Sequence, residues 1–454
     1  MNLQSLSSRP AASTICNHRR KLTDLFSIKS PVGFSSAAMP LLLSSLNIHS
    51  QPRNLMVSRQ IASGGGGDLV PKLLDRKWTL QKPESEVHRV HLSPSPRLFL
   101  RRLNASNPLL GAGNHTIHPS FYVVRDDLLH PTANGNKARK LDALIPLLLD
   151  NFVTDVITCG GCQSSHTAAV AVLCAERGMR SHLLLRGEQP QILTGYNLIS
   201  TMYGHVSYVP RSVYADREAM LKGHADLLAG SHGHVLWCSD IAKASFADES
   251  KARWNNVGVG SEEDCARKVL IINEGAGDGV ALIGLIRLVE YLSQDHVFGM
   301  EKPIRLVVDC GTGTTAIGLA LGALCLRLPW KVTAIMLADT IDRYREKEKQ
   351  LMSEFSSQYG YKLDIGDDGG LVHWVQRHCP RKFGNILEGE MEKCQQIARQ
   401  TGILVDPVYT LAAWEMAAQL SMEGEELVVM VHTGGTLGSF GLAQRYKSHF
   451  SSLK

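Results

Sequence analysis

Short apolar runs alternate with longer stretches of helical periodicity over most of this chain. A short β-branched or aliphatic run predicts a buried strand, whereas apolar positions three and four residues apart predict a helix. Between residues 150 and 240, the strand pattern occurs at Val153–Cys159, His182–Leu185, His205–Val209 and Val235–Cys238. The helical pattern lies between these strands, at Thr167–Arg177, Tyr196–Tyr203 and Tyr214–Leu228.

The second half of the chain repeats the alternation. Strands are predicted at Val269–Ile272, Arg305–Asp309, Lys331–Leu337 and Glu426–His432. Helices are predicted at Val280–Ser293, Thr315–Leu328, Asp342–Tyr359 and Leu387–Gln400. Strands that are separated by helices of this length form crossovers and parallel sheets. The sequence therefore predicts an α/β fold of two lobes, with parallel sheets flanked by helices.

In such folds, ligands bind beyond the carboxyl ends of the strands. The loops that directly follow predicted strands are therefore the places to search for chemistry. They span residues 160–166, 273–279, 311–315 and 432–436.

Length and composition narrow the class of protein. The chain has 454 residues, which exceeds the usual size of one domain, and its 44% hydrophobic and 20% charged content is that of an ordinary globular protein. No apolar run approaches the roughly 18 residues that cross a bilayer. We therefore expect no transmembrane protein.

The net charge of +5 comes from the N-terminus. Residues 1–60 contain seven Lys or Arg and one acid, Asp24, which leaves 41 basic and 42 acidic side chains in the rest. The remainder therefore has no electrostatic reason to bind nucleic acid. The N-terminal stretch is also rich in Ser, as organelle transit peptides are, although a cytosolic tail is the alternative. The run Gly64–Gly67 predicts a flexible linker.

Ten cysteines without framework spacing suit a reducing compartment. Cys159 and Cys162 have the spacing of a redox pair, but we prefer to interpret them as two small residues in a tight loop. No second Cys/His pair lies at zinc spacing, so we expect no metal.

The loop Gly311–Thr315 follows a predicted strand and opens an apolar helix. Its glycines let the backbone approach an anion, and the N–H groups at the helix start point toward it. The G-K-[ST] ending of a P-loop is missing. A dinucleotide site, with Ala316 in the place of the last glycine and Asp339 as the ribose acid, stays open, as does a simple tight turn. The loop is predicted to bind a phosphate.

The segment Asn134–Leu141 carries three cations ahead of a helix that runs through Leu149. Cations are disfavoured at a helix N-terminus, and a bound phosphate would compensate them. A lysine that acts as a nucleophile must be partly neutral, which nearby cations or burial achieve. Spacing alone does not decide between Lys137 and Lys140.

The segment Gly160–Thr167 joins a strand to a helix. Its serines and threonine are either helix caps or donors that clasp a substrate carboxylate. His166 by itself is more often a packed core histidine than a base.

Five motifs in this order resemble the D-cysteine desulfhydrase and aminocyclopropane-carboxylate deaminase family, which has the tryptophan-synthase-β fold. They are N-G-N-K-A-R-K-L (134–141), G-G-C-Q-S-S-H (160–166), G-T-G-T-T (311–315), D-P-V-Y-T (406–410) and V-H-T-G-G (431–435). They lie within roughly residues 90–445 of the sequence. The resemblance implies the type II fold of pyridoxal-phosphate (PLP) enzymes and rejects the dinucleotide alternative.

The resemblance also implies roles for individual residues. Lys137 would form the Schiff base with PLP, and Lys140 would lie toward the phosphate. Ser164 matches the family's catalytic serine and Tyr409 its active-site tyrosine. The family's phosphate loop corresponds to Gly311, Thr312, Gly313, Thr314 and Thr315.

The resemblance implies one further cofactor residue, and three other positions depart from the family's pattern. Thr410 would meet the pyridine nitrogen of PLP. Ser165 replaces the family's asparagine near the cofactor's phenolic oxygen. Phe383 stands where the family often has a second active-site tyrosine, and Leu411 begins the dipeptide that replaces its G-K. The missing tyrosine hydroxyl argues against cyclopropane ring opening and for β-elimination.

The activity that the resemblance implies is elimination of D-cysteine to pyruvate, ammonia and hydrogen sulfide, with Ser164 or Lys137 taking the α-proton. Another PLP-dependent lyase, dehydratase, deaminase or racemase is the first alternative, and a non-catalytic PLP-binding protein is the second. The family suggests a homodimer that acts on a small amino acid.

We expect three parts along the chain. Residues 1–67 would be a transit peptide and linker, with the mitochondrion as destination and the chloroplast as alternative. Residues 75–148 together with 240–454 would form a large PLP-binding domain. Residues 149–239 would form a small α/β domain.

Overall fold

The computed structural model describes residues 69–92, 99–102, 119–133, 135–247, 267–360, 370–424, 426–451 and 453. The predicted transit peptide and linker, residues 1–67, lie outside these ranges, as does Asn134. Over the described ranges, no helix combines the length and the apolar character that a bilayer span requires.

The larger sheet has seven strands in the order β11-β10-β9-β12-β3-β1-β2. Strands β11, β10, β9, β12 and β3 run parallel, whereas β1 pairs antiparallel with β3 and β2. The strands span Val87–His91 (β1), Phe99–Arg102 (β2), Ser120–Val124 (β3), Ile304–Cys310 (β9), Trp330–Met336 (β10), Val372–Gln376 (β11) and Leu427–Val431 (β12). The predictions of β9, β10 and β12 are confirmed.

The smaller sheet has five parallel strands in the order β6-β5-β4-β8-β7. They span Asp155–Gly161 (β4), Arg180–Arg186 (β5), His205–Val209 (β6), His234–Trp237 (β7) and Lys268–Ile271 (β8). All five were predicted as strands. However, β8 pairs with β4 and β7 although it lies beyond residue 239, the predicted end of the small domain. The domain division otherwise stays a prediction.

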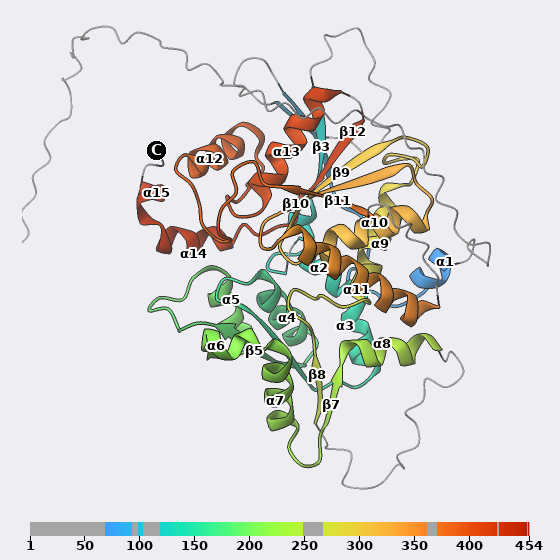
Figure 1. Cartoon of the computed structure of the whole chain (residues 1–454), viewed down its shortest axis with the longest axis vertical. Coiled ribbons are helices and arrows are strands. Elements are labelled where there is room, and N and C mark those ends of the chain that lie inside the picture. The colour runs from blue at the N-terminus through green and yellow to red at the C-terminus, as the bar shows by residue number, and fades with distance from the viewer. Residues whose placement is uncertain are drawn as a thin grey trace, which may run out of the picture. The chain divides into compact units, whose positions relative to one another are not determined.

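Alternating side chains of the larger sheet enter two separate cores, because successive residues of a strand point to opposite faces. In β9, Leu306 and Val308 pack with α9 and α10, whereas Val307 packs with α12 and α13 on the other face. The sheet is therefore the middle of three layers, and Figure 1 shows these helices around its strands. The helices that matter for the site are α2 (Asn136–Asp142), α4 (Ser165–Ala175), α5 (Gly195–Tyr203), α9 (Ala281–Leu292), α10 (Thr314–Cys325), α11 (Ile341–Tyr359), α12 (Glu390–Thr401), α13 (Thr410–Glu423) and α14 (Gly438–Arg445).

The remaining helices are shorter or lie at the periphery of the sheets. They are α1 (Leu69–Leu74), η1 (Asp126–Leu128), α3 (Leu144–Asp150), α6 (Arg211–Ala215), α7 (Arg217–Ala229), α8 (Cys238–Ala247) and α15 (Lys447–Ser451).

One predicted helix is two helices in the structure. The helix expected to run through Leu149 ends at Asp142 and restarts as α3. Pro146 explains the break, since it has no N–H to donate to the carbonyl of Asp142. That carbonyl accepts instead from the backbone N–H of Thr79 (2.9 Å). The short α2 is thus a separate unit that carries the lysines.

Candidate active site

The start of α2 is fixed between two loops of the larger sheet. Gly135 has a φ of +66°, and a Cβ there would collide with the backbone of Thr433, so the position requires glycine. The Asn136 N–H donates to the Thr433 carbonyl (3.2 Å), and its side-chain amide donates to Thr315 Oγ1 (2.9 Å). Lys137, the next residue, is therefore held between the loop after β12 and the start of α10.

Burial brings Lys137 toward neutrality. Desolvation lowers its pKa to about 8, although the nearby Asp309 carboxylate acts in the opposite direction. Lys140 is almost fully buried, and its pKa falls well below the ordinary value because of burial and the charge of Lys137. Its Nζ donates to the Gly275 carbonyl (2.9 Å). Of the two lysines that spacing left open, Lys140 is committed to the backbone, which favours Lys137 as the nucleophile.

The loop Gly311–Thr315 has the geometry of an anion cradle. Gly313 has a φ of +86°, and a Cβ there would lie 3.1 Å from the ring of Tyr344 and 3.2 Å from that of Trp374. The Tyr344 hydroxyl lies 2.8 Å from the carbonyl oxygens of Cys310 and Gly311 and holds the loop from behind. The backbone N–H groups of the first turn of α10 are left for a ligand, as at any helix N-terminus.

A second loop, residues 273–279, packs on the cradle and receives lysines from α2 and α11. Gly275 packs so closely on Thr312 that a Cβ would lie 2.9 Å from its methyl carbon. Lys347 of α11 donates to the Gly277 carbonyl (3.0 Å), and its charge contributes to lowering the pKa of Lys140. Lys347 could not be singled out from the sequence, because α11 has many other charged residues.

Asp406 organises the turn that presents Tyr409. Its carboxylate accepts the backbone N–H groups of Val408 and Tyr409 (both 2.9 Å) and of Thr410 (3.2 Å). It also accepts the Thr410 hydroxyl (2.9 Å), and that hydroxyl accepts the Asp406 N–H (2.8 Å). The D-P-V-Y-T motif is thus a closed network that starts α13.

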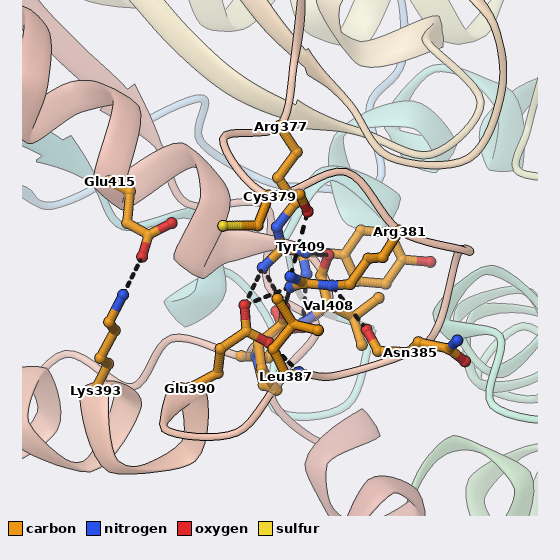
Figure 2. A network of polar contacts seen from close by, with 12 residues as sticks. Arg377, Cys379, Arg381, Asn385, Leu387, Glu390, Lys393, Val408, Tyr409 and Glu415 are labelled. Carbon is orange, nitrogen blue, oxygen red and sulfur yellow. Dashed lines mark hydrogen bonds and ion pairs between the residues drawn. The ribbon is translucent and has the colours of Figure 1, made fainter. Parts of the chain in front are cut away.

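Two buried arginines hold the same turn from outside, as Figure 2 shows. Arg377 donates to the carbonyls of Pro407 (2.7 Å) and Val408 (3.1 Å) and to Glu390 (3.1 Å). Arg381 donates to the same Glu390 oxygen (2.5 Å) and to Pro407 (3.3 Å). These three charged residues form what we call the arginine clamp. The arginine clamp was not predicted, since nothing in a sequence pairs Arg377 with a turn 30 residues later.

The Tyr409 ring lies against the phosphate loop. A Cβ on Gly311 would be 3.5 Å from its Cε1 atom. Phe383 packs on the ring edge-to-face with centroids 5.6 Å apart, and it brings no hydroxyl. Burial and the charges of Asp406 and Asp309 raise the pKa of Tyr409, so its phenol stays protonated. The structure thus brings the predicted tyrosine and phosphate loop together.

Ser164 caps α4, where its Oγ accepts the Thr167 N–H (3.3 Å). His166 is buried: the Thr158 hydroxyl donates to the Ile272 carbonyl (2.8 Å) and accepts from His166 Nε2 (2.9 Å). Burial and the charges of two lysines keep the pKa of His166 well below its ordinary value. His166 is therefore a buried neutral histidine, as expected, although its Nδ1 has no hydrogen-bond partner among the described residues.

The charges that act on His166 are those of Lys137 and Lys140, which places the start of α4 near α2. Ser165 is the first residue of α4 and is half-buried, and its role stays a prediction.

Two polar groups of this region were missed by sequence analysis. Asp309 ends the apolar run of β9, where it was counted as strand, and it is nearly fully buried. Burial raises its pKa to about 7. Tyr196 of α5 is also buried, and its hydroxyl has no hydrogen-bond partner among the described residues. The backbone amides of Gly435 and Leu437 nevertheless act to lower its pKa, so they lie near that hydroxyl.

The two cysteines of C-G-G-C lie in different surroundings. Cys159 lies in β4 and is fully buried, and burial raises its pKa to about 12. Cys162 is partly exposed, and both thiols are free. Across the described ranges, no group of three His, Cys, Asp or Glu side chains has the arrangement of a metal site.

The two sheets, the lysine-bearing α2 and the cradle before α10 together define the type II fold of PLP-dependent enzymes. A solved structure described as an ACC deaminase homologue (ACC is 1-aminocyclopropane-1-carboxylate) has this fold, with a TM-score of 0.60 and 21% identity over 84% of this chain and 99% of that one. No family model matches the chain.

Curated relatives narrow the class to a family. A rice (Oryza sativa subsp. japonica) protein named "Putative D-cysteine desulfhydrase 2, mitochondrial" is 54% identical over 86% of this chain and 98% of its own length. An Arabidopsis thaliana protein named as a bifunctional, mitochondrial D-cysteine desulfhydrase and 1-aminocyclopropane-1-carboxylate deaminase is 24% identical over 82% of this chain and 86% of its own length. The chain belongs to the D-cysteine desulfhydrase family.

Proposed function

We propose that this chain is a PLP-dependent carbon–sulfur lyase that converts D-cysteine and water into pyruvate, ammonia and hydrogen sulfide. The observation that carries the proposal is the Lys137 amine, whose pKa of about 8 makes it an available nucleophile beside a phosphate cradle. The names of the rice and Arabidopsis relatives support D-cysteine as the substrate.

The residues present fit PLP. Lys137 would hold the cofactor's aldehyde carbon, while the first turn of α10 and the cations Lys140 and Lys347 would hold its phosphate. The left-handed Gly313 and the two lysines that donate to the neighbouring loop, Lys140 to Gly275 and Lys347 to Gly277, suit an anionic group at the start of α10. Bound PLP supplies an electron sink for the negative charge that is left on the substrate's α-carbon.

Three side chains of the chain are proposed to act on the substrate. Ser164, or Lys137 once it is released from the cofactor, takes the α-proton. Ser164 lies at the N-terminus of α4, where partial positive charge favours negative charge on its oxygen. Tyr409 stays protonated, because its pKa is raised, and donates a hydrogen bond to the departing sulfur.

The test is to locate the cofactor and then measure the products. Borohydride reduction of the full-length protein with PLP, followed by peptide mapping, should place the label on Lys137. Lys137→Ala should abolish both this label and sulfide release from D-cysteine. Lys222→Ala changes an exposed lysine of α7 and serves as control. A label that persists elsewhere in Lys137→Ala would contradict the proposal.

A substrate panel separates the proposed activity from its neighbours in the family. The panel contains D-cysteine, L-cysteine, D-serine and 1-aminocyclopropane-1-carboxylate, with sulfide and keto acid as readouts. Because Phe383 packs on Tyr409 without a hydroxyl, we expect no turnover of the cyclopropane substrate. PLP bound at Lys137 with no turnover of any amino acid would indicate a non-catalytic binding protein.

We further propose that the enzyme is mitochondrial and acts as a homodimer. The word mitochondrial in the names of both plant relatives supports the location, and the basic, Ser-rich residues 1–60 fit a transit peptide. A fluorescent fusion of the whole chain tests this, with a chloroplast signal as the contrary result. Light scattering of the purified protein tests the dimer.

A further inference from the structure

The hydroxyl groups of Thr410 and Thr433 have already committed their protons to carboxylates. Thr410 donates to Asp406 (2.9 Å), and Thr433 Oγ1 lies 2.7 Å and 2.9 Å from the two carboxylate oxygens of Asp309. Each hydroxyl has one proton to give. An unprotonated pyridine nitrogen that sought either donor would have to break one of these buried bonds. Thr410, the partner that the resemblance implies, is therefore engaged elsewhere.

The two carboxylates differ in the number of hydrogen bonds that they accept. Asp406 accepts three backbone N–H groups and one hydroxyl. Within the described ranges, the hydrogen bonds that other residues give to the Asp309 carboxylate all come from the single Thr433 hydroxyl. Asp309 is only 3% exposed, so bulk solvent does not complete its shell. A buried carboxylate with so few donors is costly unless it is protonated or meets a cationic donor.

Asp309 belongs to the same cluster as Lys137 and the phosphate loop. It lies two residues before Gly311, at the carboxyl end of β9. Thr433, which donates to Asp309, also accepts the backbone N–H of Asn136 through its carbonyl (3.2 Å). One residue thus bridges Asp309 and the segment that carries Lys137, and the charge of Asp309 acts directly on the Lys137 amine.

We propose that Asp309 is the residue that partners the ring nitrogen of PLP, with its carboxylate accepting a hydrogen bond from the protonated nitrogen. Thr433 orients that carboxylate, and Thr410 serves only to close the Asp406 turn. This inference rests on the proposed function, because it requires PLP bound through Lys137. A carboxylate partner keeps positive charge on the ring, which makes a stronger electron sink than a hydroxyl partner does.

The direct test is the protonation state of the ring nitrogen. PLP labelled with ¹⁵N in the ring is bound to the full-length protein, and the ¹⁵N chemical shift is recorded. We expect the shift of a protonated nitrogen in the wild type and in Thr410→Val, and that of an unprotonated nitrogen in Asp309→Asn. A protonated shift in Asp309→Asn, or an unprotonated one in the wild type, would overturn the inference.

A binding comparison covers the case in which Asp309→Asn folds poorly. The 1-deaza analogue of PLP has a C–H in place of the ring nitrogen and cannot bond to Asp309. The wild type should bind PLP about tenfold or more tightly than the analogue, since a hydrogen bond to a charged group is lost. In Asp309→Ser the preference should fall to about threefold or less. An equal preference in both proteins would sink the idea.

The two hypotheses fail in distinguishable ways. If the wild type takes up no PLP at Lys137 by borohydride mapping, both fail. If PLP is bound at Lys137 and its ring nitrogen is unprotonated, the assignment of Asp309 fails while the lyase proposal stands. If the nitrogen is protonated through Asp309 but no sulfide forms from D-cysteine, the substrate assignment alone fails.

Discussion

Single buried groups at this site differ in whether their hydrogen bonds are complete, and the incomplete ones are the best candidates for ligand contacts. Asp406 is saturated and acts as scaffold, whereas Asp309 and the Tyr196 hydroxyl are not. An unpaired buried polar atom costs free energy of folding, and no interaction within the fold offsets that cost. Tyr196 also lies close enough to contribute to the raised pKa of Tyr409. We therefore expect the Tyr196 hydroxyl to face the substrate.

Tyr196→Phe should raise the KM for D-cysteine several-fold. Stability should change by less than about 1 kcal/mol, because the hydroxyl has no close hydrogen-bond partner among the described residues and only the amides of Gly435 and Leu437 lie near it. Tyr208→Phe is the matched control: its hydroxyl is bonded to the Asn197 side chain (3.0 and 3.1 Å), so that variant should lose stability and keep its KM. Steady-state kinetics and denaturant unfolding give both values. An unchanged KM in Tyr196→Phe would refute a substrate contact.

At the scale of elements, the start of α13 depends on residues that lie outside it. The arginine clamp connects the loop after β11 and the start of α12 to the backbone just before Tyr409. Two guanidinium groups share one carboxylate there, so Glu390 neutralises a buried positive charge. Its loss would leave two buried cations facing one another.

Glu390→Gln should therefore destabilise the fold by about 3 kcal/mol and lower kcat as Tyr409 loses its support. Glu415→Gln removes a neighbouring but mostly exposed pair with Lys393, also drawn in Figure 2, and should cost less than about 1 kcal/mol. Urea denaturation of both variants measures the difference. Equal losses of unfolding free energy in the two variants would show that the arginine clamp stabilises the fold no more than the exposed pair does.

Most elements on which the site stands were predictable from the sequence. The apolar runs of β4, β5, β8, β9, β10 and β12 could be predicted directly, because buried parallel strands have largely continuous apolar sequences. The edge strands β6 and β7 are more exposed but were also predicted. Four strands, β1, β2, β3 and β11, were not predicted. Of these, V-H-R-V-H and V-H-W-V-Q mix polar and apolar residues over only five positions, whereas the apolar run of β3 was overlooked. The break after Asp142 was missed because Pro146 leaves the Asp142 carbonyl without its helical donor, and the donor that replaces it, the Thr79 N–H, is known only from the structure.

The site itself was predictable only where a motif carried it. Lys137, Tyr409 and the phosphate loop lie in motifs, and the structure brings them together. Lys347 and Asp309 looked like an ordinary surface charge and an ordinary strand residue. What makes them part of the site is the tertiary fold, which buries one carboxylate beside α2 and aims one lysine of α11 at the loop after β8.

For the whole molecule, the ionisation of Lys137 links stability to pH. Its folded pKa of about 8 lies below the ordinary 10.5, so the unfolded chain binds more protons between these values. Stability of the PLP-free protein should therefore rise with pH across this window, by up to about 3 kcal/mol. Lys137→Met should make that rise smaller, while Lys140, whose pKa is also lowered, keeps a rise of its own. Unfolding curves at several pH values test it, and parallel pH profiles for the two proteins would contradict it.

The junction between Gln163 and the C-terminal helix has a practical consequence. Gln163 accepts the Tyr196 N–H (3.1 Å) and donates to the Thr194 carbonyl (2.9 Å), while Gly441 of α14 packs so tightly on it that no larger residue would fit. A chain shortened before Gly438 would keep all the residues proposed for chemistry. However, the segment Gly160–Thr167, which carries Ser164, would lose its packing against α14. Expression of a trimmed enzyme should therefore preserve the last 17 residues, and purification tags belong at the other end, downstream of any import signal.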